Sequence, residues 1–310
     1  MKKTLYTFML ILIIGLLAAC GSDNTEEGAD TQVENETETT NQEEENAPEL
    51  ETSERIISTT VAITEIMDEL ELDLVGVPTS YKDLPERYAD ATEVGNPMGP
   101  DLEIILSLQP DNVLTVTNLQ ADLEEKFSNA NVPATYLDLD SVGAMFDEIM
   151  ALGEKYDRKE QAQRLVDEFD DKMKEIEAQV EGKEAPSVLI LMGIPGSYIV
   201  GTEHSYIGDL VKRAGGEIAI SGHEEDYISA NTEYLQQTDP DIILRAAHGA
   251  PEEVVKMFDR EFAENDIWKH FRAVQEGRVY DLEETRFGTT ANLAVIEAMD
   301  ELVSILYPEN

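Results

Sequence analysis

The apolar residues between positions 158 and 181 recur in steps of three and four, and charged residues occupy most of the other positions. The apolar positions are Ala162, Leu165, Val166, Phe169, Met173, Ile176 and Val180. This spacing predicts one long amphipathic helix, Arg158–Glu181. The stripe covers too few heptads for a coiled coil, so we expect a spine that docks on two flanking lobes and permits little hinge motion.

Similar sequence stands on either side of this helix, in Asp101–Leu114 and Asn231–Leu244. In both segments a Glu, Glu103 or Glu233, precedes a Pro-Asp pair by seven residues, and an apolar run follows. The repeat predicts two related halves that enclose a cleft.

Short apolar runs alternate with helical patterns throughout both halves, which predicts an α/β fold with mainly parallel sheets. Strands are expected at 55–58, 74–77, 112–116 and 134–137, and then at 187–192, 198–201, 241–244 and 278–280. Helices are expected at 61–70, 101–108, 121–130 and 141–151, and then at 206–214, 252–258, 261–265 and 291–306. We therefore expect an N-terminal lobe at 54–157, the connecting helix at 158–182 and a C-terminal lobe at 183–310.

The first residues are typical of an export signal, with Lys2 and Lys3 before an apolar run and small residues at Ala18 and Ala19. The sequence around Cys20 resembles a bacterial lipobox, which predicts a signal peptide at 1–19 and a lipidated Cys20. An ordinary cysteine near a cleavage site is one alternative. A transmembrane helix is the other, although the run is short for a bilayer span.

Residues 20–53 are rich in Asp, Glu, Thr and Asn and contain no Lys or Arg. Such a segment cannot bury enough apolar surface to fold, so we expect a disordered tether. The formal net charge of −44 argues against nucleic acid or anionic lipid as a direct ligand. Because Cys20 is the only cysteine, no intrachain disulfide or cysteine metal cluster can form.

Two residues carry the candidate chemistry. His248 follows an expected strand of the second half, where open α/β sheets bind ligands, and Met98 lies in the Gly- and Pro-rich loop 95–100 of the first half. A thioether and an imidazole on opposite walls of a cleft can serve as the two axial ligands of a haem. A lone His is more often a surface or hydrogen-bonded side chain, and that alternative stays open.

Residues 55–310 resemble the IsdE-type haem-binding lipoproteins of Gram-positive bacteria, within the siderophore- and cobalamin-binding class of ABC-importer substrate-binding proteins. The resemblance is carried by Thr59–Met67, Val77–Tyr81, Pro97–Asp101, Leu189–Gly193, Tyr198, Thr202–Leu210, Arg245–Gly249 and Asp266–Phe271. It implies a class III periplasmic-binding-protein fold and a transport protein that catalyses no reaction.

The resemblance also implies a ligand set. Met98 and His248 would ligate the iron of haem b from opposite lobes, and the propionates would be received by Thr60, Val61, Ala62, Ser80, Tyr81 and Lys82. The start of a capped helix favours such anions. Arg245 would either offset propionate charge or form a structural ion pair. A ferric siderophore is the alternative cargo; its iron is already saturated and needs no axial pair.

In this importer class, paired carboxylates such as Glu103 and Glu233 meet arginines of a dimeric permease; otherwise they are solvated residues of a first helical turn. The implied partners are that permease with its ATPase and cell-wall haem-binding proteins as donors. We expect a monomer anchored by lipid on the outer face of the cell membrane.

The other histidines and sequence motifs give little support to any other function. His204 is expected to make local hydrogen bonds, His223 to lie in an exposed loop or touch a divalent cation, and His270 to pack beside Trp268 and Phe271. No Gly-x-Ser-x-Gly or His-Glu-x-x-His motif supports a hydrolase. Four scattered histidines offer little to a zinc or manganese carrier.

Overall fold

The computed structural model of the protein describes residues 54–230, 235 and 238–308, all within one structural unit, Thr52–Asn310. The expected signal peptide, Cys20, the acidic tether and Glu233 lie outside the described residues. Among the residues that are described, no helix combines the length and apolar character needed to cross a bilayer.

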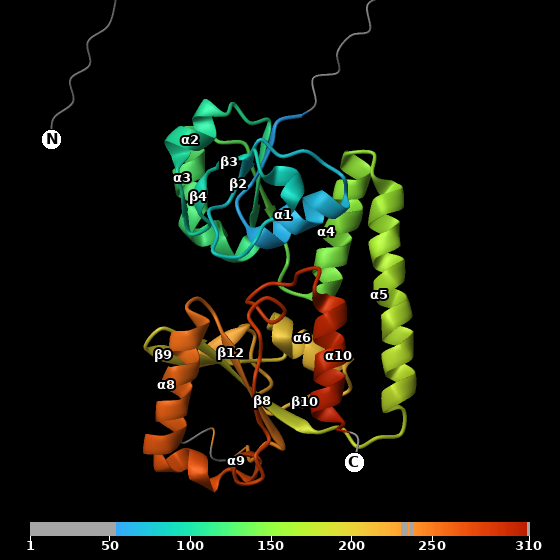
Figure 1. Ribbon diagram of the computed structural model, residues 1–310, viewed down its shortest axis with the longest axis vertical. Coiled ribbons are helices and arrows are strands. Elements are labelled where there is room, and N and C mark those ends of the chain that lie inside the picture. Colours follow the sequence, from blue (N-terminus) through green and yellow to red (C-terminus); the bar gives the residue numbers. More distant parts are fainter. Residues whose placement is uncertain (1–53, 231–234, 236–237, 309–310) are drawn as a thin grey trace, which may run out of the picture. The chain divides into compact units, whose positions relative to one another are not determined.

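The N-terminal lobe is built on a five-stranded parallel sheet, with strand order β3-β2-β1-β6-β7 (Figure 1). The strands are β1 (Ile56–Ser58), β2 (Gly76–Val77), β3 (Thr92–Glu93), β6 (Asn112–Val116) and β7 (Ala134–Leu137). Every residue of β1 and β6 is buried, which explains why these strands read as unbroken runs rather than as alternating patterns.

Four helices accompany this sheet: α1 (Val61–Glu69), α2 (Leu102–Ser107), α3 (Gln120–Ala130) and α4 (Val142–Lys155). Short 3-10 turns lie at η1 (Glu86–Tyr88) and η2 (Thr117–Leu119). The side chains of Thr60, Asp101 and Ser141 accept backbone N–H bonds at the starts of α1, α2 and α4. Side-chain caps of this kind satisfy backbone N–H groups that have no partner within the helix and so fix where these three helices begin.

The Gly- and Pro-rich segment that was expected to be a loop forms a minimal antiparallel hairpin, β4 (Gly95–Asn96) and β5 (Gly99–Pro100). Pro97 and Met98 make its two-residue turn. Gly95 has a φ of 98°, a conformation that glycine adopts at little cost. The density of glycine and proline argued against regular structure and concealed so short a pairing.

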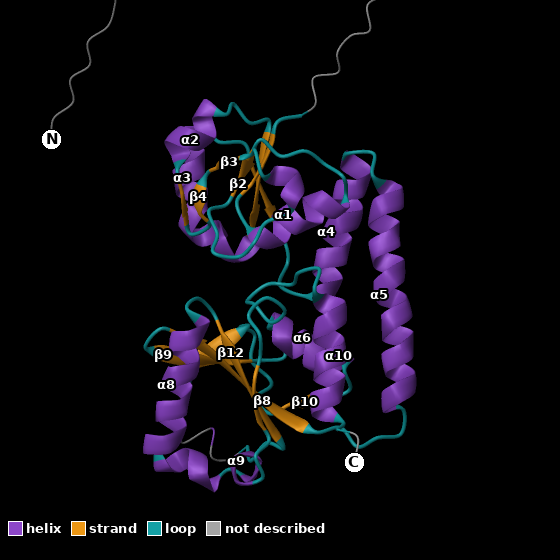
Figure 2. Ribbon diagram, in the orientation of Figure 1, coloured by secondary structure: helices purple, strands orange, loops and turns teal. Residues whose placement is uncertain are grey.

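The C-terminal lobe has a mixed six-stranded sheet, drawn in orange in Figure 2. Its strands are β8 (Ser187–Ile194), β9 (Ser197–Gly201), β10 (Glu217–Ile218), β11 (Tyr227–Ser229), β12 (Ile242–Ala247) and β13 (Val279–Asp281). The pairings of β8 with β10 and β12 and of β12 with β13 are parallel, as the prediction of mainly parallel sheets requires, whereas β9 pairs antiparallel with both β8 and β11. Pro195 and Gly196 join β8 to β9 in two residues. A connection that short can only join antiparallel strands.

The two sheets nevertheless share a parallel core. Strand β1 lies between β2 and β6 with β7 beyond, and β8 lies between β10 and β12 with β13 beyond. The prediction of two related α/β lobes is confirmed by this shared order.

The helices of the C-terminal lobe are α6 (Tyr206–Arg213), α8 (Pro251–Glu264), α9 (Arg272–Gln275) and α10 (Val295–Leu306), with a 3-10 turn η3 (Asp266–His270). Two short helices were expected where α8 runs without interruption. No glycine or proline separates the two predicted segments, so nothing in the sequence ends the helix between them.

The predicted connecting helix is α5 (Lys159–Val180), which runs alongside α4 and α10 (Figure 1). Its buried positions, Ala162, Phe169 and Ile176, are spaced seven residues apart and belong to one apolar cluster. That cluster also contains buried residues of α1 and α4 from the first lobe and of α6 and α10 from the second. The apolar core is therefore continuous from lobe to lobe along α5.

Ion pairs add to the contact of α5 with each lobe. Arg164 pairs with Glu69 of α1 at 3.2 Å, and Lys172 pairs with Asp300 of α10 at 3.2 Å. Because the carboxylate of each pair is about half exposed, each pair contributes at most about 1 kcal/mol. Burial of the apolar stripe dominates the docking of α5.

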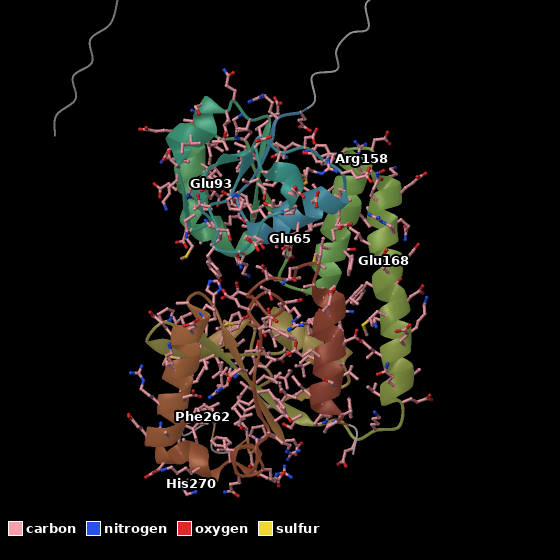
Figure 3. The ribbon with its side chains drawn as sticks, viewed as in Figure 1. Glu65, Glu93, Arg158, Glu168, Phe262 and His270 are labelled. Atoms are coloured by element: carbon pink, nitrogen blue, oxygen red, sulfur yellow. The ribbon has the colours of Figure 1, made fainter. Side chains whose placement is uncertain are left out.

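We predict that Phe169→Ala lowers the free energy of unfolding by about 3–5 kcal/mol. Phe169 is 5% exposed and its ring centroid lies 4.9 Å from that of Phe146 on α4. Chemical denaturation measures the change. Glu168→Ala, an exposed neighbour on the same helix (Figure 3), is the matched control and should change stability by less than about 0.5 kcal/mol. Equal effects of the two variants would contradict the role assigned to the stripe.

Candidate ligand-binding cleft

A cleft of about 760 Å³ lies between the two lobes and takes lining residues from both. The first lobe contributes the start of α1, the loop after β2, the β4–β5 turn and the end of β6. The second contributes Asp226 and Tyr227, His248, and part of the segment between β13 and α10. The volume is within the range of roughly 300–1,000 Å³ that suits small-molecule and cofactor ligands.

Met98 stands at the tip of the β4–β5 hairpin on one wall of this cleft. Its backbone N–H donates to the Asn96 side-chain oxygen at 2.9 Å, while its side chain is 62% exposed. A large apolar residue left this open is not packing the core. The backbone of Met98 is held, and its thioether remains available to a ligand.

His248 is the first residue beyond β12, at the carboxyl end of a parallel strand. Its backbone N–H donates to the Gly193 carbonyl oxygen at 2.8 Å, and its side chain is exposed on the cleft. Gly249 and Ala250 follow with φ values of 71° and 46° and lead into Pro251 at the start of α8. For Ala250 this left-handed conformation is strained, as is common at ligand sites.

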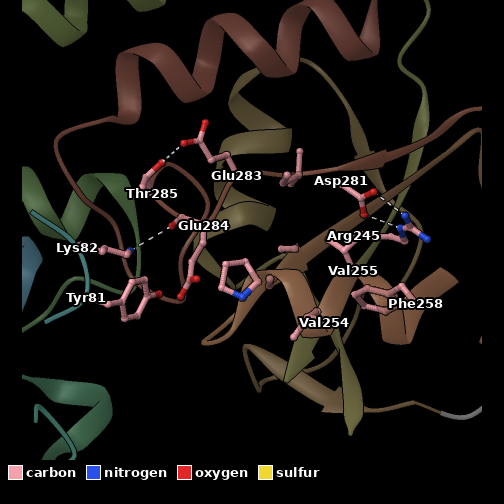
Figure 4. Close-up of a pocket in the computed structure, with 14 residues that line it drawn as sticks. Tyr81, Lys82, Arg245, Val254, Val255, Phe258, Asp281, Glu283, Glu284 and Thr285 are labelled. Atoms are coloured by element: carbon pink, nitrogen blue, oxygen red, sulfur yellow. Dashed lines mark hydrogen bonds and ion pairs between the residues drawn. The ribbon is translucent and has the colours of Figure 1, made fainter. Parts of the chain in front are cut away.

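The side chain of Glu284 supports the His248 loop. It is 8% exposed, and its Oε1 accepts the Gly249 N–H at 2.9 Å. Figure 4 shows the same carboxylate facing the hydroxyl of Tyr81, which comes from the other lobe. Partial burial, followed by the hydrogen bond to Glu284 and its charge, raises the pKa of Tyr81. Sequence reasoning missed Glu284, because its partners lie far away in the chain and no local pattern marks it.

The loop after β2 reaches the same region. Ser80 accepts the Lys82 N–H at 2.9 Å, and Lys82 Nζ donates to the Glu284 carbonyl oxygen at 3.4 Å (Figure 4). Tyr81 and Lys82 line the cleft, whereas Ser80 does not line it and stabilises the loop through its hydrogen bond. A cationic side chain is thereby held at the mouth of the cleft.

The start of α1 forms the wall of the cleft beside this loop. Thr60 caps the helix, and its side chain accepts the Ile63 N–H at 3.4 Å. Thr60, Val61 and Ala62 all line the cleft, and the first turn of the helix contains no charged residue. The partial positive charge of the helix start is therefore directed at the ligand space without a competing acid in that turn.

Two acidic side chains in the cleft, Glu65 and Asp226, are partly shielded from water. Burial raises the pKa of Glu65, on α1, although nearby Lys82 lowers it. Burial also raises the pKa of Asp226; His204 opposes that shift and Asp138 adds to it. Charges that a ligand brings into such a site interact more strongly than they would in open water.

Arg245 lies outside this cleft, in an adjoining pocket of about 210 Å³ (Figure 4). Its guanidinium makes bonds of 2.7 and 2.6 Å to Asp281 and one of 3.1 Å to Asp259. It also lies over the rings of Phe258 and Phe262. This arrangement favours the structural ion pair, one of the two alternatives that the sequence left open.

The other candidates are not brought into the cleft. Glu103 is exposed on α2, where the Asp101 side chain caps its N–H at 2.9 Å. The backbone N–H of His204 donates to Thr202 Oγ1 at 3.2 Å. His270 is exposed at the far end of the C-terminal lobe (Figure 3), whereas its sequence neighbours Trp268 and Phe271 are buried.

Comparison with known proteins gives the family. The sequence profile of the periplasmic binding protein family matches residues 56–285. The chain belongs to this family. The binding protein is 49% identical over 256 residues to the high-affinity heme uptake system protein IsdE of Staphylococcus aureus (strain bovine RF122 / ET3-1), covering 82% of this chain and 88% of that one.

Solved structures agree with the sequence relation. An ABC transporter substrate-binding protein from Listeria monocytogenes EGD-e matches the binding protein with a TM-score of 0.79 and 56% identity, covering 83% of this chain and 100% of that one. S. aureus IsdE complexed with heme matches with a TM-score of 0.80 and 48% identity, over 82% and 99% of the two chains. The resemblance inferred from the sequence and the two-lobed α/β fold are confirmed. The binding protein belongs to a class of transport proteins, not of enzymes.

Proposed function

We propose that this binding protein captures haem b in the interlobe cleft, with Met98 and His248 as axial ligands, and delivers it to an ABC permease for iron acquisition. One observation carries the proposal: an exposed thioether and an exposed imidazole, from opposite lobes, line the same 760 Å³ cleft. The relation to IsdE, whose solved complex contains heme, supports haem as the cargo.

The two ligands suit haem iron in different ways. Imidazole is a good ligand for iron, and the backbone of His248 is fixed at a strand end by its bond to Gly193. Thioether is a softer and poorer donor to ferric iron, and Met98 sits on a small hairpin. Release to the permease would then begin with loss of the Met98 bond.

Both propionates project from one edge of the otherwise apolar porphyrin ring. The amides at Val61 and Ala62 and the ammonium group of Lys82 supply positive charge on one side of the cleft. Thr60 and Ser80 would act by holding these groups in place, through the helix cap and the loop hydrogen bond. Tyr81 would offer its hydroxyl beside them.

The cellular setting follows the same proposal. Cys20 would carry the lipid anchor after removal of residues 1–19, and the acidic tether would hold the binding protein, as a monomer, on the outer face of the cell membrane. Haem would come from cell-wall haem-binding proteins. The binding protein would pass it to the permease and its ATPase.

Haemin titration of Met98→Ala and His248→Ala tests the axial pair. Each variant should lose at least the roughly 10–100-fold in affinity that even outer-shell changes cost at metal sites, and should shift the Soret band. Met257→Ala, which lines a different pocket on α8, and His270→Ala are matched controls and should bind as the unaltered protein does. Unchanged affinity and an unchanged Soret band in both cleft variants would exclude the pair.

Docking to the permease is tested by the double variant Glu103→Lys, Glu233→Lys. Charges at an interface mainly steer association and set register, so haemin affinity should be unchanged while haem-dependent uptake by cells falls. Exposed Glu124→Lys, Glu125→Lys on α3 changes the net charge equally and is the control. Normal uptake with the first double variant would count against the docking role.

A further inference from the structure

Glu65 occupies an unexpected place for a carboxylate. It lies four residues after Val61 on α1 and therefore one turn further along the same helix face. Both residues line the cleft, and Figure 3 shows Glu65 on the N-terminal lobe. The acid stands next to the helix start that is proposed to receive the ligand's own carboxylates.

The surroundings of Glu65 do little to neutralise it. The side chain is half-buried, and no hydrogen bond to its carboxylate is present among residues 54–230 and 238–308. Lys82 is the cation whose charge acts on it. Burial outweighs that effect and raises the pKa of Glu65, so the protonated form is easier to reach than for an exposed glutamate.

We infer that Glu65 couples ligand binding to proton uptake and makes the cleft sensitive to ligand charge. The inference rests on the proposed haem function and adds a residue to it. Ionised Glu65 repels the propionates and competes with them for Lys82. Protonated Glu65 does neither, so haem binding favours the protonated acid.

The direction of the pH dependence follows from this repulsion. A bound dicarboxylate raises the pKa of Glu65 above its value in the free protein, so the complex holds more protons. Haem affinity therefore rises as the pH falls through the pKa of Glu65 in the complex. It becomes constant, with respect to this group, below the pKa of the free protein.

Other groups in the cleft also titrate and must be separated from Glu65. The charged and titratable residues that line it are Tyr81, Lys82, Asp83, Asp226, Tyr227, His248 and Glu284. Protonation of His248 would remove an axial ligand and weaken binding in acid, which is the opposite direction. All of these groups are present in both Glu65→Gln and the unaltered protein, so the ratio of their affinities isolates Glu65.

The experiment measures haemin affinity from about pH 5 to about pH 8 for the unaltered protein, Glu65→Gln and Glu65→Asp. At the highest pH, Glu65→Gln should bind haemin about tenfold more tightly than the unaltered protein, and the advantage should shrink as the pH falls. Glu65→Asp keeps the charge and should keep the pH dependence. Glu125→Gln, an exposed carboxylate on α3 that does not line the cleft, is the control and should have little effect.

Haemin dimethyl ester separates charge from shape, because it lacks the propionate charges. Glu65→Gln should show no advantage with the ester at any pH. An equal gain for haemin and ester, or haemin affinity with the same pH profile in both proteins, would overturn the inference and leave the haem function intact. Failure of the unaltered protein to bind haemin at all would instead overturn the proposed function.

Discussion

The docking of α5 along one continuous apolar core is the constraint on which the cleft depends. Ala162, Phe169 and Ile176 repeat every seven residues, so a single helix face meets buried side chains of both lobes. A two-lobed protein held together only by loops would leave the separation of its lobes undefined. Here the packing of α5 against both lobes, rather than the loops that carry Met98 and His248, sets the separation of these two residues, and close packing tolerates few arrangements.

Within that frame, the site combines fixed backbones with available side chains. Met98 and His248 each have a bonded N–H and an exposed side chain, and buried Glu284 holds the loop after His248 through Gly249. The same glutamate faces Tyr81 from the opposite lobe. Contacts across the cleft therefore bear directly on the loop that presents the imidazole. A ligand whose carboxylates bind Tyr81 and Lys82 would alter the contacts of these two residues with Glu284.

Much of the fold was predictable from local chemistry. The helices expected to begin near residues 61, 101 and 141 do begin there, because the caps Thr60, Asp101 and Ser141 bond N–H groups only two or three positions away. The long spine was predicted to within a residue at each end by its apolar spacing alone. The antiparallel part of the second sheet was missed, since Pro195 and Gly196 read equally well as an open loop. The β4–β5 hairpin was missed for a similar reason.

Some residues of the site were predictable from the sequence and others were not. Met98 and His248 were suggested by residue type and by their places after strands or in a Gly- and Pro-rich turn, and the structure brings both to one cleft. Glu284 and Glu65 could not be predicted. Glu284 acts on a residue 35 positions away, and Glu65 looks like any polar position of an amphipathic helix until the cleft is seen. Arg245 was uncertain from sequence because its carboxylate partners come from other elements, at Asp259 and Asp281.

Far-red absorption and magnetic circular dichroism of the protein loaded with ferric haem test the central claim most directly, since charge transfer from a thioether to ferric iron gives a band that imidazole alone does not. The account predicts a low-spin haem with that sulfur band, and its loss in Met98→Ala. A high-spin spectrum, or a low-spin spectrum without the sulfur band in the unaltered protein, would contradict ligation by His248 and Met98 together.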